Sequence, residues 1–275
     1  MPVNLVIGKA LKFIILLATA LSVLLPFWML FISSLRDRAV LFEHPPRLWP
    51  ANASLDNYVN LLERESFLVW FQNSFNVSFF GTLFMVLVCV PCGYAFAKKD
   101  FPLKTLLFLM ILATMMIPPT VTLFPSFVIA RELGLVDTAT GMYITGVASV
   151  FGMFLMKQYM EGVPDQILQS AKIDGAGEYR TFLQIVVPLS KPAVAMLVIW
   201  GFMAHWNNLL WPLIISRRDA TRTLPVGIAS FSTQDGVHWH IVMAATVLSF
   251  IPVLIVFLIF RRQFIAGLTE GAVKG

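Results

Sequence analysis

Charged residues are scarce in this sequence. Of its 275 residues, 13% are Asp, Glu, Lys or Arg and 58% are hydrophobic, and the mean hydropathy is +0.79. A soluble domain is typically about 25% charged and about 45–50% apolar. One globular core cannot bury this excess of apolar residues. The composition therefore excludes an ordinary soluble protein and indicates that lipid surrounds part of the chain.

Cysteine is almost absent. The two cysteines, Cys89 and Cys92, form a Cys-x-x-Cys string inside an apolar stretch. Such a pair can serve redox chemistry or zinc binding, but a zinc site needs four ligands, and the sequence offers neither a second pair nor a nearby histidine. Buried cysteine otherwise behaves as a small hydrophobic residue. We therefore expect both cysteines to be structural and expect no metal site.

The sequence also lacks a nucleotide-binding motif. A phosphate-binding loop needs Gly, four residues, Gly-Lys and then Ser or Thr. The Gly8-Lys9 pair is followed by Ala10 and has no upstream glycine. We therefore expect this chain to bind no nucleotide cofactor of its own.

Acidic residues are missing from the long apolar stretches. An ion-coupled secondary transporter would need an ionisable group at membrane depth, and His205 is the one obvious candidate. A membrane-embedded enzyme would need a nucleophile–base pair or a metal cluster, and neither is visible in these stretches. Both classes stay open as alternatives, but the sequence disfavours them.

What the sequence does contain is a set of long apolar runs. A bilayer span needs about 20 mostly apolar residues, and it must be helical because lipid cannot satisfy backbone polar groups. The first run is too long for a signal peptide and has no cleavage site after it. The sequence thus predicts an all-α integral membrane protein with six transmembrane helices, at about 11–33, 74–97, 104–125, 139–157, 192–215 and 241–260.

The distribution of basic residues predicts the orientation. If the N-terminus lies inside, 12 of the 20 Lys and Arg residues, including every lysine, fall in inner segments. Positive charge concentrates in cytoplasmic loops, so we expect cytoplasmic N- and C-termini. The longest outer segment then runs from Ser34 to Ser66, with a short helix expected near Leu55–Tyr58. A second short helix, ended by Gly134, is expected between Ser126 and Asp137.

The longest inner segment, from Lys157 to Lys191, is patterned like a helical hairpin. Pro164 suits a first helical turn, and Gly175 can end the helix in a left-handed cap. A second helix is expected from about Glu178 to Ile185, ending before Pro188. Two short helices joined in this way would project into the cytoplasm, and an apolar stripe on the first suggests that they dock onto another protein.

This segment resembles the EAA loop of ATP-binding-cassette (ABC) importer permeases. That pattern reads Glu-Ala-Ala, three residues, Gly, nine residues, Ile-x-Leu-Pro. The spacing here fits it fully, although Gln169, Ser170 and Val187 replace Glu, the first Ala and Leu. The expected ATPase-coupling residues are Gln169, Ser170, Ala171, Asp174, Gly175, Ile185 and Pro188.

Two further strings are similar to the carbohydrate-uptake branch of that family. They are Trp206-Asn207 followed by Leu210-Trp211-Pro212, and the tail that begins at Gly267. They resemble the maltose-importer permease MalG and its relatives, and the likeness covers nearly the whole chain. The resemblance implies the type I ABC importer permease fold in a bacterial inner membrane, with a first helix and loop at 1–69, a permease domain at 70–261 and a cytoplasmic tail at 262–275.

The resemblance also implies the partners. A second, similar permease, two copies of an ABC ATPase and a soluble sugar-binding protein are expected, with ATP and Mg bound by the ATPases alone. This chain would be a non-catalytic subunit. Its tail, rich in glycine, is expected either to be disordered or to reach the ATPases.

Polar residues in the fifth apolar run are the candidates for the sugar pathway. Charged or amide groups at membrane depth usually face a cavity or a partner, and the candidates are His205, Trp206, Asn207, Asn208 and Trp211. In a regular helix His205 and Asn208 would share one side, while Asn207 and Trp211 would share nearly the opposite side. Pro212 is expected to bend the helix near Asn208.

The last outer loop, from Ser216 to His240, resembles a loop that relatives insert toward the binding protein. Its candidate residues are Ser232, Thr233, Gln234, His238 and Trp239. The sequence does not identify the substrate, since oligosaccharides, disaccharides and glycerol-3-phosphate all move through similar permeases. Lys and Arg are missing from the middle of the spans, which favours a neutral sugar over an anion.

Overall fold

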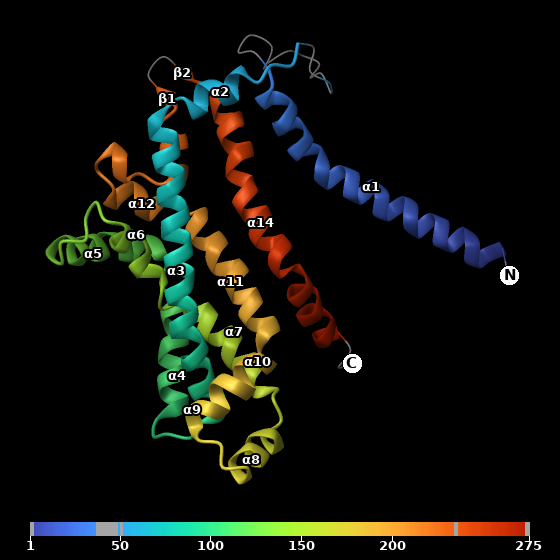
Figure 1. The fold of residues 1–275 in the computed structure, drawn as a ribbon, viewed down its shortest axis with the longest axis vertical. Helices are drawn as coiled ribbons and strands as arrows, with labels where there is room; N and C mark the ends of the chain where they lie inside the picture. The colour runs from blue at the N-terminus through green and yellow to red at the C-terminus, as the bar shows by residue number, and fades with distance from the viewer. Residues whose placement is uncertain (1–2, 37–48, 50–51, 234–235, 273–275) are drawn as a thin grey trace. The chain divides into compact units, whose positions relative to one another are not determined.

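The computed structural model describes residues 3–36, 49, 52–233 and 236–272 (Figure 1). The chain divides into two compact units, each formed by two segments. Unit 1 comprises Met1–Phe67 and Ile228–Ile251, and unit 2 comprises Leu68–Gly227 and Pro252–Gly275.

Unit 1 contains two helices, a small hairpin and the start of a third helix. These elements are α1 (Val3–Ser34), α2 (Asp56–Leu62), β1 (Ser232–Thr233), β2 (Gly236–Val237) and the first turns of α14 (Trp239–Ala272). The strands pair antiparallel, with Ser232 opposite Val237. The Asn57 side chain of α2 donates to the Ser34 and Arg36 carbonyls at 2.9 and 2.8 Å, which satisfies carbonyls at the end of α1 that have no partner within the helix.

Unit 2 contains the remaining helices, most of them short. After α3 (Glu65–Lys98) they are α4 (Lys104–Ala113), η1 (Thr114–Met116), α5 (Pro119–Glu132), α6 (Ala139–Tyr143), η2 (Ile144–Gly146), α7 (Val150–Glu161), α8 (Asp165–Ile173), α9 (Glu178–Thr181), η3 (Phe182–Val186), α10 (Val187–Leu189), α11 (Lys191–Trp206), α12 (Leu210–Ile215), η4 (Asp219–Thr221) and α13 (Leu224–Ala229).

Three helical segments are continuous and apolar enough to cross a membrane. They are Gly8–Ser34, Ser66–Lys98 and Trp239–Gln263, and they overlap three of the predicted spans. Among the described residues, three bent pairs of helices overlap the other predicted spans, with bends of 101°, 47° and 76°. The predicted number of six is therefore reached when each bent pair is counted as one span, whereas the inside position of the termini stays a prediction.

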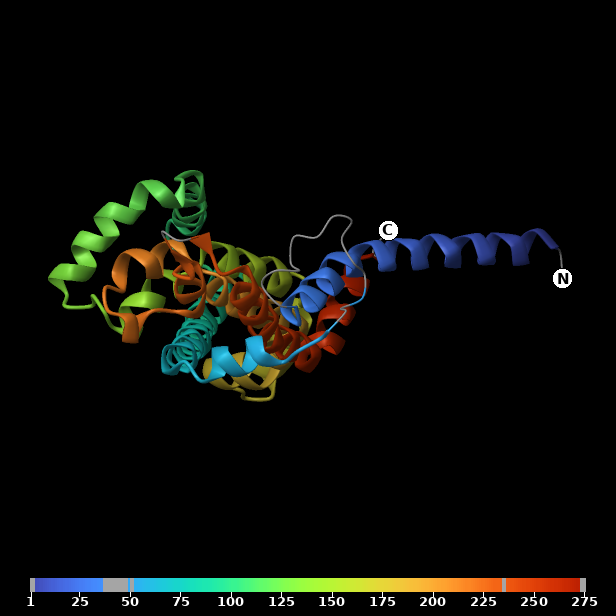
Figure 2. The same ribbon diagram turned by 90° about the horizontal axis from the view of Figure 1, so that it is seen from above.

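The third predicted span, 104–125, is not one straight helix. It bends by 101° between η1 and α5, and Figure 2 shows α4 nearly end-on while α5 runs across the view. Pro118 and Pro119 explain the break, because a residue before proline is pushed out of the helical conformation. Ile117 and Pro118 are indeed extended, with ψ of 118° and 132°. The helix expected before Gly134 is the end of α5, and Gly134 has the expected positive φ of 69°.

The fifth predicted span is also interrupted. α11 ends at Trp206 and α12 begins at Leu210, so residues 207–209 are not helical. Pro212 would clash with the Asn208 carbonyl in a continuous helix, and the chain breaks there instead of bending. The prediction that His205 and Asn208 share one side of a continuous helix, opposite Asn207 and Trp211, is therefore wrong, because the helix ends at Trp206.

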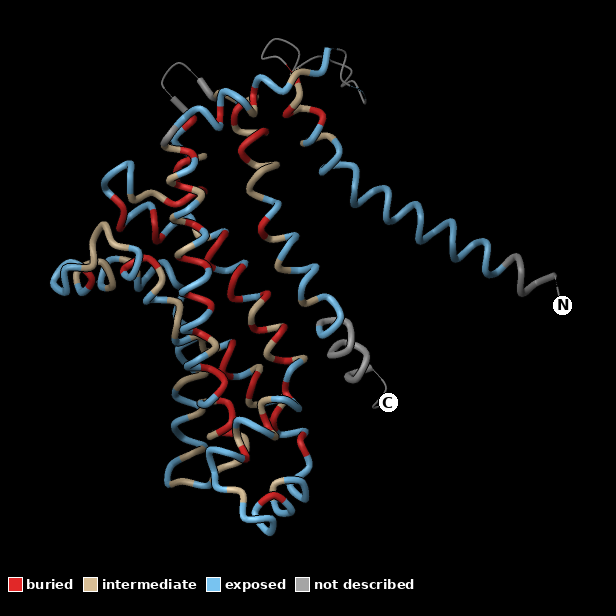
Figure 3. Tube along the Cα trace, viewed as in Figure 1, coloured by how far each residue is buried: buried red, intermediate tan, exposed pale blue. Residues whose placement is uncertain are grey.

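The core of unit 2 lies where α3, α7 and α11 meet. Met85, Cys89, Met156 and Leu197 are among its buried side chains, and buried residues line the inner sides of these helices in Figure 3. Cys89 and Cys92 are free thiols, and the Cys89 thiol donates to the Ser149 carbonyl at 3.4 Å. Cys89 thus packs as a small core residue, as predicted. By contrast, every residue of α1 from Gly8 to Trp28 is exposed.

Candidate functional site

The predicted hairpin is present, as residues 164–189. Its first helix, α8, begins after Pro164 and ends at Ile173, with Asp174 as its C-cap, and Gly175 follows at φ 78°. The Ala176 N–H donates to the Ala171 carbonyl at 2.9 Å, and the Gly175 N–H donates to the Lys172 carbonyl at 3.1 Å. This pair of bonds is the Schellman cap, which requires a left-handed residue and thus favours glycine.

The second helix of the hairpin differs from the prediction. It does not end before Pro188 but runs from α9 through η3 and α10 to Leu189, and η3 is a π-helical turn. Pro188 lacks an N–H and clashes with the carbonyl four residues earlier in an ordinary helix. The wider π turn directly before it accommodates the proline, and such turns are frequent at functional sites.

The hairpin has a buried side and an exposed apolar side. Ala171 is buried and Leu168 packs against the core of unit 2. Ile173 and Tyr179 are 86% and 83% exposed, and Leu183 is also exposed. Large apolar side chains that are exposed on the same short hairpin indicate an interaction surface. Of the predicted coupling residues, those exposed are Gln169, Ser170, Asp174, Gly175 and Pro188, while Ile185 is half-buried.

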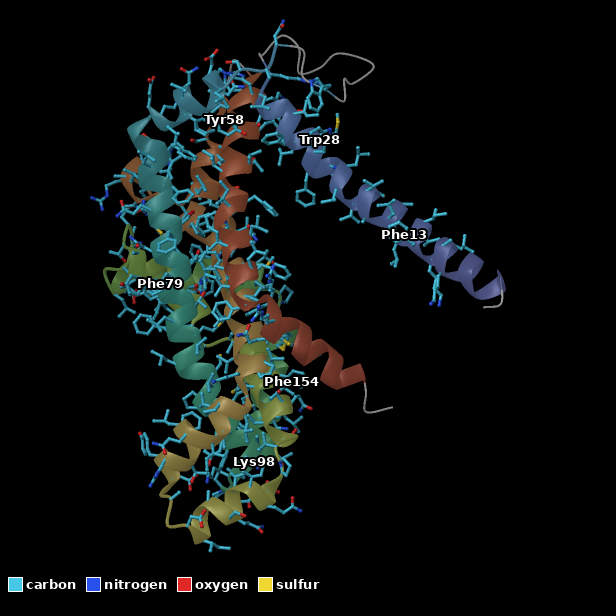
Figure 4. All side chains as sticks on the ribbon, turned by 45° about the vertical axis from the view of Figure 1, so that its right-hand side comes forward. Phe13, Trp28, Tyr58, Phe79, Lys98 and Phe154 are labelled. Atoms are coloured by element: carbon cyan, nitrogen blue, oxygen red, sulfur yellow. The ribbon has the colours of Figure 1, made fainter. Side chains whose placement is uncertain are left out.

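Two lysines that the sequence analysis assigned only to topology hold this hairpin in place. Lys98, labelled in Figure 4, donates to the Val163 carbonyl at 2.6 Å and pairs with Asp165 at 2.7 Å. Its side chain is 6% exposed. Because Asp165 lies in the first turn of α8, the negative charge also suits the positive end of that helix dipole.

Lys99 performs the same role for the second helix. It pairs with Glu178, the first residue of α9, and lies 5.1 Å above the Tyr94 ring. The Tyr94 hydroxyl donates to the same carboxylate at 2.6 Å. The hydrogen bonds from Lys99 and Tyr94 hold the pKa of Glu178 below its ordinary value. The hairpin is thus fixed to the end of α3 at two points.

The predicted pathway residues separate into two groups. His205 and Trp206 are buried in the protein. The His205 ring lies against Gly81 and Gly146, where an added Cβ would come within 2.7 and 2.4 Å of it, and it hydrogen-bonds the Gly81 backbone. Trp206 stacks on Phe202 with ring centroids 5.5 Å apart. Both residues therefore pack within unit 2.

Asn208 and Trp211, in contrast, line a cavity of about 310 Å³. The remaining wall comes from α5, η2 and α12. It includes Leu210 and a set of residues that the sequence did not single out: Pro119, Thr120, Thr122, Leu123, Ser126, Thr145 and Gly146. Trp211 is fixed there because its indole N–H donates to the Gly141 carbonyl at 2.8 Å. Asn207 is exposed and does not belong to the lining.

The candidate residues of the last outer loop lie in unit 1. Ser232 and Thr233 form β1, His238 is half-buried and Trp239 begins α14. Gln234 lies outside the described residues. Within the part of the chain that the structure describes, no three His, Cys, Asp or Glu side chains are grouped to hold a metal ion.

Comparison with known proteins identifies related sequences over most of the chain. Residues 89–270 match the family described as binding-protein-dependent transport system inner membrane component. The arabinooligosaccharides transport system permease protein AraQ of Bacillus subtilis is 35% identical over 93% of this chain and 92% of its own length. The sn-glycerol-3-phosphate transport system permease protein UgpE of Yersinia pestis is 33% identical over 94% of each chain.

Two solved structures share the fold. The first is a crystal structure of a bacterial ABC transporter involved in the import of the acidic polysaccharide alginate. It matches with a TM-score of 0.82 and 23% identity, over 96% of this chain and 99% of that chain. The second shows the bacterial alginate ABC transporter in complex with an alginate pentasaccharide-bound periplasmic protein. It matches with a TM-score of 0.69 and 13% identity, over 94% and 96% of the two chains.

Proposed function

Because this chain belongs to the binding-protein-dependent transport system inner membrane component family, we propose that it forms one side of the pathway of an ATP-driven sugar importer. It is an inner-membrane transport permease with the type I ABC importer permease fold. Its relatives are named for arabinooligosaccharides and for sn-glycerol-3-phosphate. The proposed substrate is an oligosaccharide or disaccharide that a soluble binding protein delivers.

The observation that carries this proposal is the construction of the 164–189 hairpin. Its outer side exposes Ile173 and Tyr179, while its base is fixed to α3 by Lys98 and Lys99. The exposed apolar side chains can bind a separate ATPase, and the anchored base can transmit the movement of that ATPase to α3. Movement of the ATPase would then be transmitted through the hairpin to the membrane helices.

The proposed complex needs three kinds of partner. A second permease would close the pathway, two ATPase subunits would bind ATP and Mg, and a soluble binding protein would dock outside. In this arrangement residues 70–261 form the permease domain and the chain itself catalyses no reaction. The loop that includes Ser232, Thr233, His238 and Trp239 is the proposed contact with the binding protein.

Purification of the tagged chain in mild detergent tests the proposal. We expect an ATPase subunit and a second permease to copurify, and we expect the reconstituted complex to import arabinotriose when ATP and the binding protein are present. Copurification without any nucleotide-hydrolysing subunit would overturn the proposal. Import of glycerol-3-phosphate instead of a sugar would keep the importer and replace the substrate class.

A further inference from the structure

Three interrupted helical segments meet at the cavity of about 310 Å³ in unit 2. Pro119 follows the break between η1 and α5, Thr145 and Gly146 precede the break between η2 and α7, and Asn208 lies in the break between α11 and α12. Non-helical backbone at membrane depth is tolerated only where it is buried in protein or lines a water-filled cavity. The three breaks thus place non-helical backbone beside one cavity, whose wall mixes apolar side chains with hydroxyl and amide groups.

Several side chains of the lining have unused hydrogen-bonding capacity. The hydroxyl groups of Thr120, Ser126 and Thr145 make no hydrogen bond within the described part of the chain, nor does the amide nitrogen of Asn208. Thr120 and Thr145 are exposed, and Ser126 and Asn208 are half-buried. All four can therefore donate or accept hydrogen bonds to a polar molecule that enters the cavity.

α5 brings hydroxyl and apolar side chains to the cavity together. Thr122, Leu123 and Ser126 line it, whereas Val121 and Phe124 are 63% and 76% exposed. The α5 wall thus offers hydroxyl groups next to an apolar side chain.

The chemistry of the lining selects between the two substrates for which the relatives are named. Hydroxyl and amide groups both donate and accept hydrogen bonds, and they match the hydroxyl groups of a sugar ring. None of the described lining residues is ionisable, so a phosphate or carboxylate would find no countercharge. The volume is at the lower end of ligand pockets, which suits one ring of a longer sugar.

We propose that this cavity is a subsite for one neutral glycosyl unit of the transported sugar, held by the hydroxyl groups of Thr120, Ser126 and Thr145 and by the amide of Asn208. The proposal rests on the proposed function, because it assigns the substrate class within the same importer. Trp211, fixed by its bond to Gly141, forms a rigid wall of the subsite.

The test uses the whole reconstituted complex with arabinotriose and glycerol-3-phosphate as probes. Thr145→Val and Asn208→Leu are each expected to lower the maximal uptake rate of arabinotriose about three- to tenfold, because each removes one hydrogen bond to the sugar. The matched control is Thr114→Val in η1, whose hydroxyl group donates to the Ile111 carbonyl and lies outside the cavity. Uptake is compared at equal amounts of assembled complex.

A labelling experiment measures occupancy directly. In a Ser126→Cys variant, arabinotriose should slow modification by a membrane-impermeant maleimide, and glycerol-3-phosphate should not; the unmodified chain, with Cys89 and Cys92, gives the background. The subsite is overturned if the wild-type complex imports arabinotriose while Thr145→Val and Asn208→Leu match Thr114→Val, or if both probes protect equally. If the wild-type complex does not import arabinotriose, this subsite assignment is overturned, whereas the proposed function fails only if no ATPase subunit copurifies.

Discussion

Lys98 and Lys99 are neighbours at the end of α3, and each forms an ion pair with the first residue of a different helix. Lys98 pairs with Asp165 of α8, and Lys99 pairs with Glu178 of α9. One short stretch of backbone therefore fixes both helices of the 164–189 hairpin. Force on the hairpin can reach α3 through these two ion pairs as well as through the packing of Leu168 and Phe182.

The Lys99–Glu178 pair should be needed for coupling. We expect Lys99→Ala to weaken attachment of α9 by roughly 0.5–1 kcal/mol, since the pair is partly exposed. Sugar uptake per ATP hydrolysed should then fall in proteoliposomes, whereas Lys104→Ala, which removes a lysine paired only with Asp100, should leave this ratio unchanged. The exchange Lys99→Glu with Glu178→Lys should restore part of the loss. Equal ratios in Lys99→Ala and Lys104→Ala would contradict the coupling role.

Attachment of α9 should also depend on pH. Hydrogen bonds from Lys99 and Tyr94 lower the pKa of Glu178 from its ordinary value of 4.5. A carboxylate whose pKa is lowered in the folded form stabilises that form when the pH lies above the ordinary pKa of the group. This stabilisation is lost as the pH falls through the lowered pKa. Hydrogen exchange at the start of α9 should therefore quicken between about pH 5 and pH 3, beyond the intrinsic pH trend. Glu178→Gln should remove this dependence, and an unchanged profile in that variant would refute the assignment.

Two glycines of the hairpin make a matched pair for testing the Schellman cap. An added Cβ would meet no atom within 4 Å at either Gly175 or Gly177, but only Gly175 has a positive φ, of 78°. Gly175→Val should therefore strain the cap by about 1–3 kcal/mol and reduce coupled transport. Gly177→Val should behave like the wild type in the same assay. Similar activity in the two variants would show that the left-handed turn is dispensable.

The fit of His205 between α3 and η2 gives a prediction on stability. A Cβ at position 81 would lie 2.7 Å from the imidazole, so Gly81→Ala should destabilise the protein by about 1–3 kcal/mol. Thermal unfolding in detergent would measure this, with Gly8→Ala as a control because no atom lies within 4 Å of that site. His205→Ala should relieve the clash in the double variant. If the loss of stability in the double variant equalled the sum of the losses in the two single variants, direct packing of His205 on Gly81 would be refuted.

Asp137 links the ends of α5 and α12, and its removal should be costly. It has φ 59° and accepts hydrogen bonds from the Arg217 N–H at 2.6 Å and the Thr221 hydroxyl at 2.7 Å. Asp137→Ala should lower the free energy of unfolding by about 1–2 kcal/mol, because the exposed Arg217 N–H and the half-buried Thr221 hydroxyl lose their charged acceptor. Asp137→Asn, which tolerates this backbone conformation and keeps one oxygen, should lose less. Chemical denaturation of the two variants would rank them.

Local features of the sequence predicted the hairpin well. Pro164, the spacing of Leu168 and Ala171, and Gly175 together determine α8 and its cap, because each acts within one or two turns. The attachment of the hairpin could not be predicted in the same way. Glu178 lies far along the chain from Lys99, and a lysine at the end of a span is already explained by membrane topology.

The lining of the cavity could be predicted only in part, because it too depends on contacts between distant segments of the chain. Asn208 and Trp211 stand out in an apolar segment, but Thr120, Ser126 and Thr145 do not, because single hydroxyl groups are common in such segments. Only the breaks in three helical segments bring these residues together. Pro118 and Pro119 signal one break in the sequence, whereas the extent of the 207–209 break depends on how α12 packs.

The π turn at Phe182–Val186 holds more residues over its rise than ordinary helical winding would. Deleting one residue there would restore ordinary winding and keep the direction of the residues that follow, but it would bring Pro188 against a carbonyl of the preceding turn. The extra residue and the proline are thus matched to each other, and this segment should accept a shortening by one only when Pro188 is replaced as well.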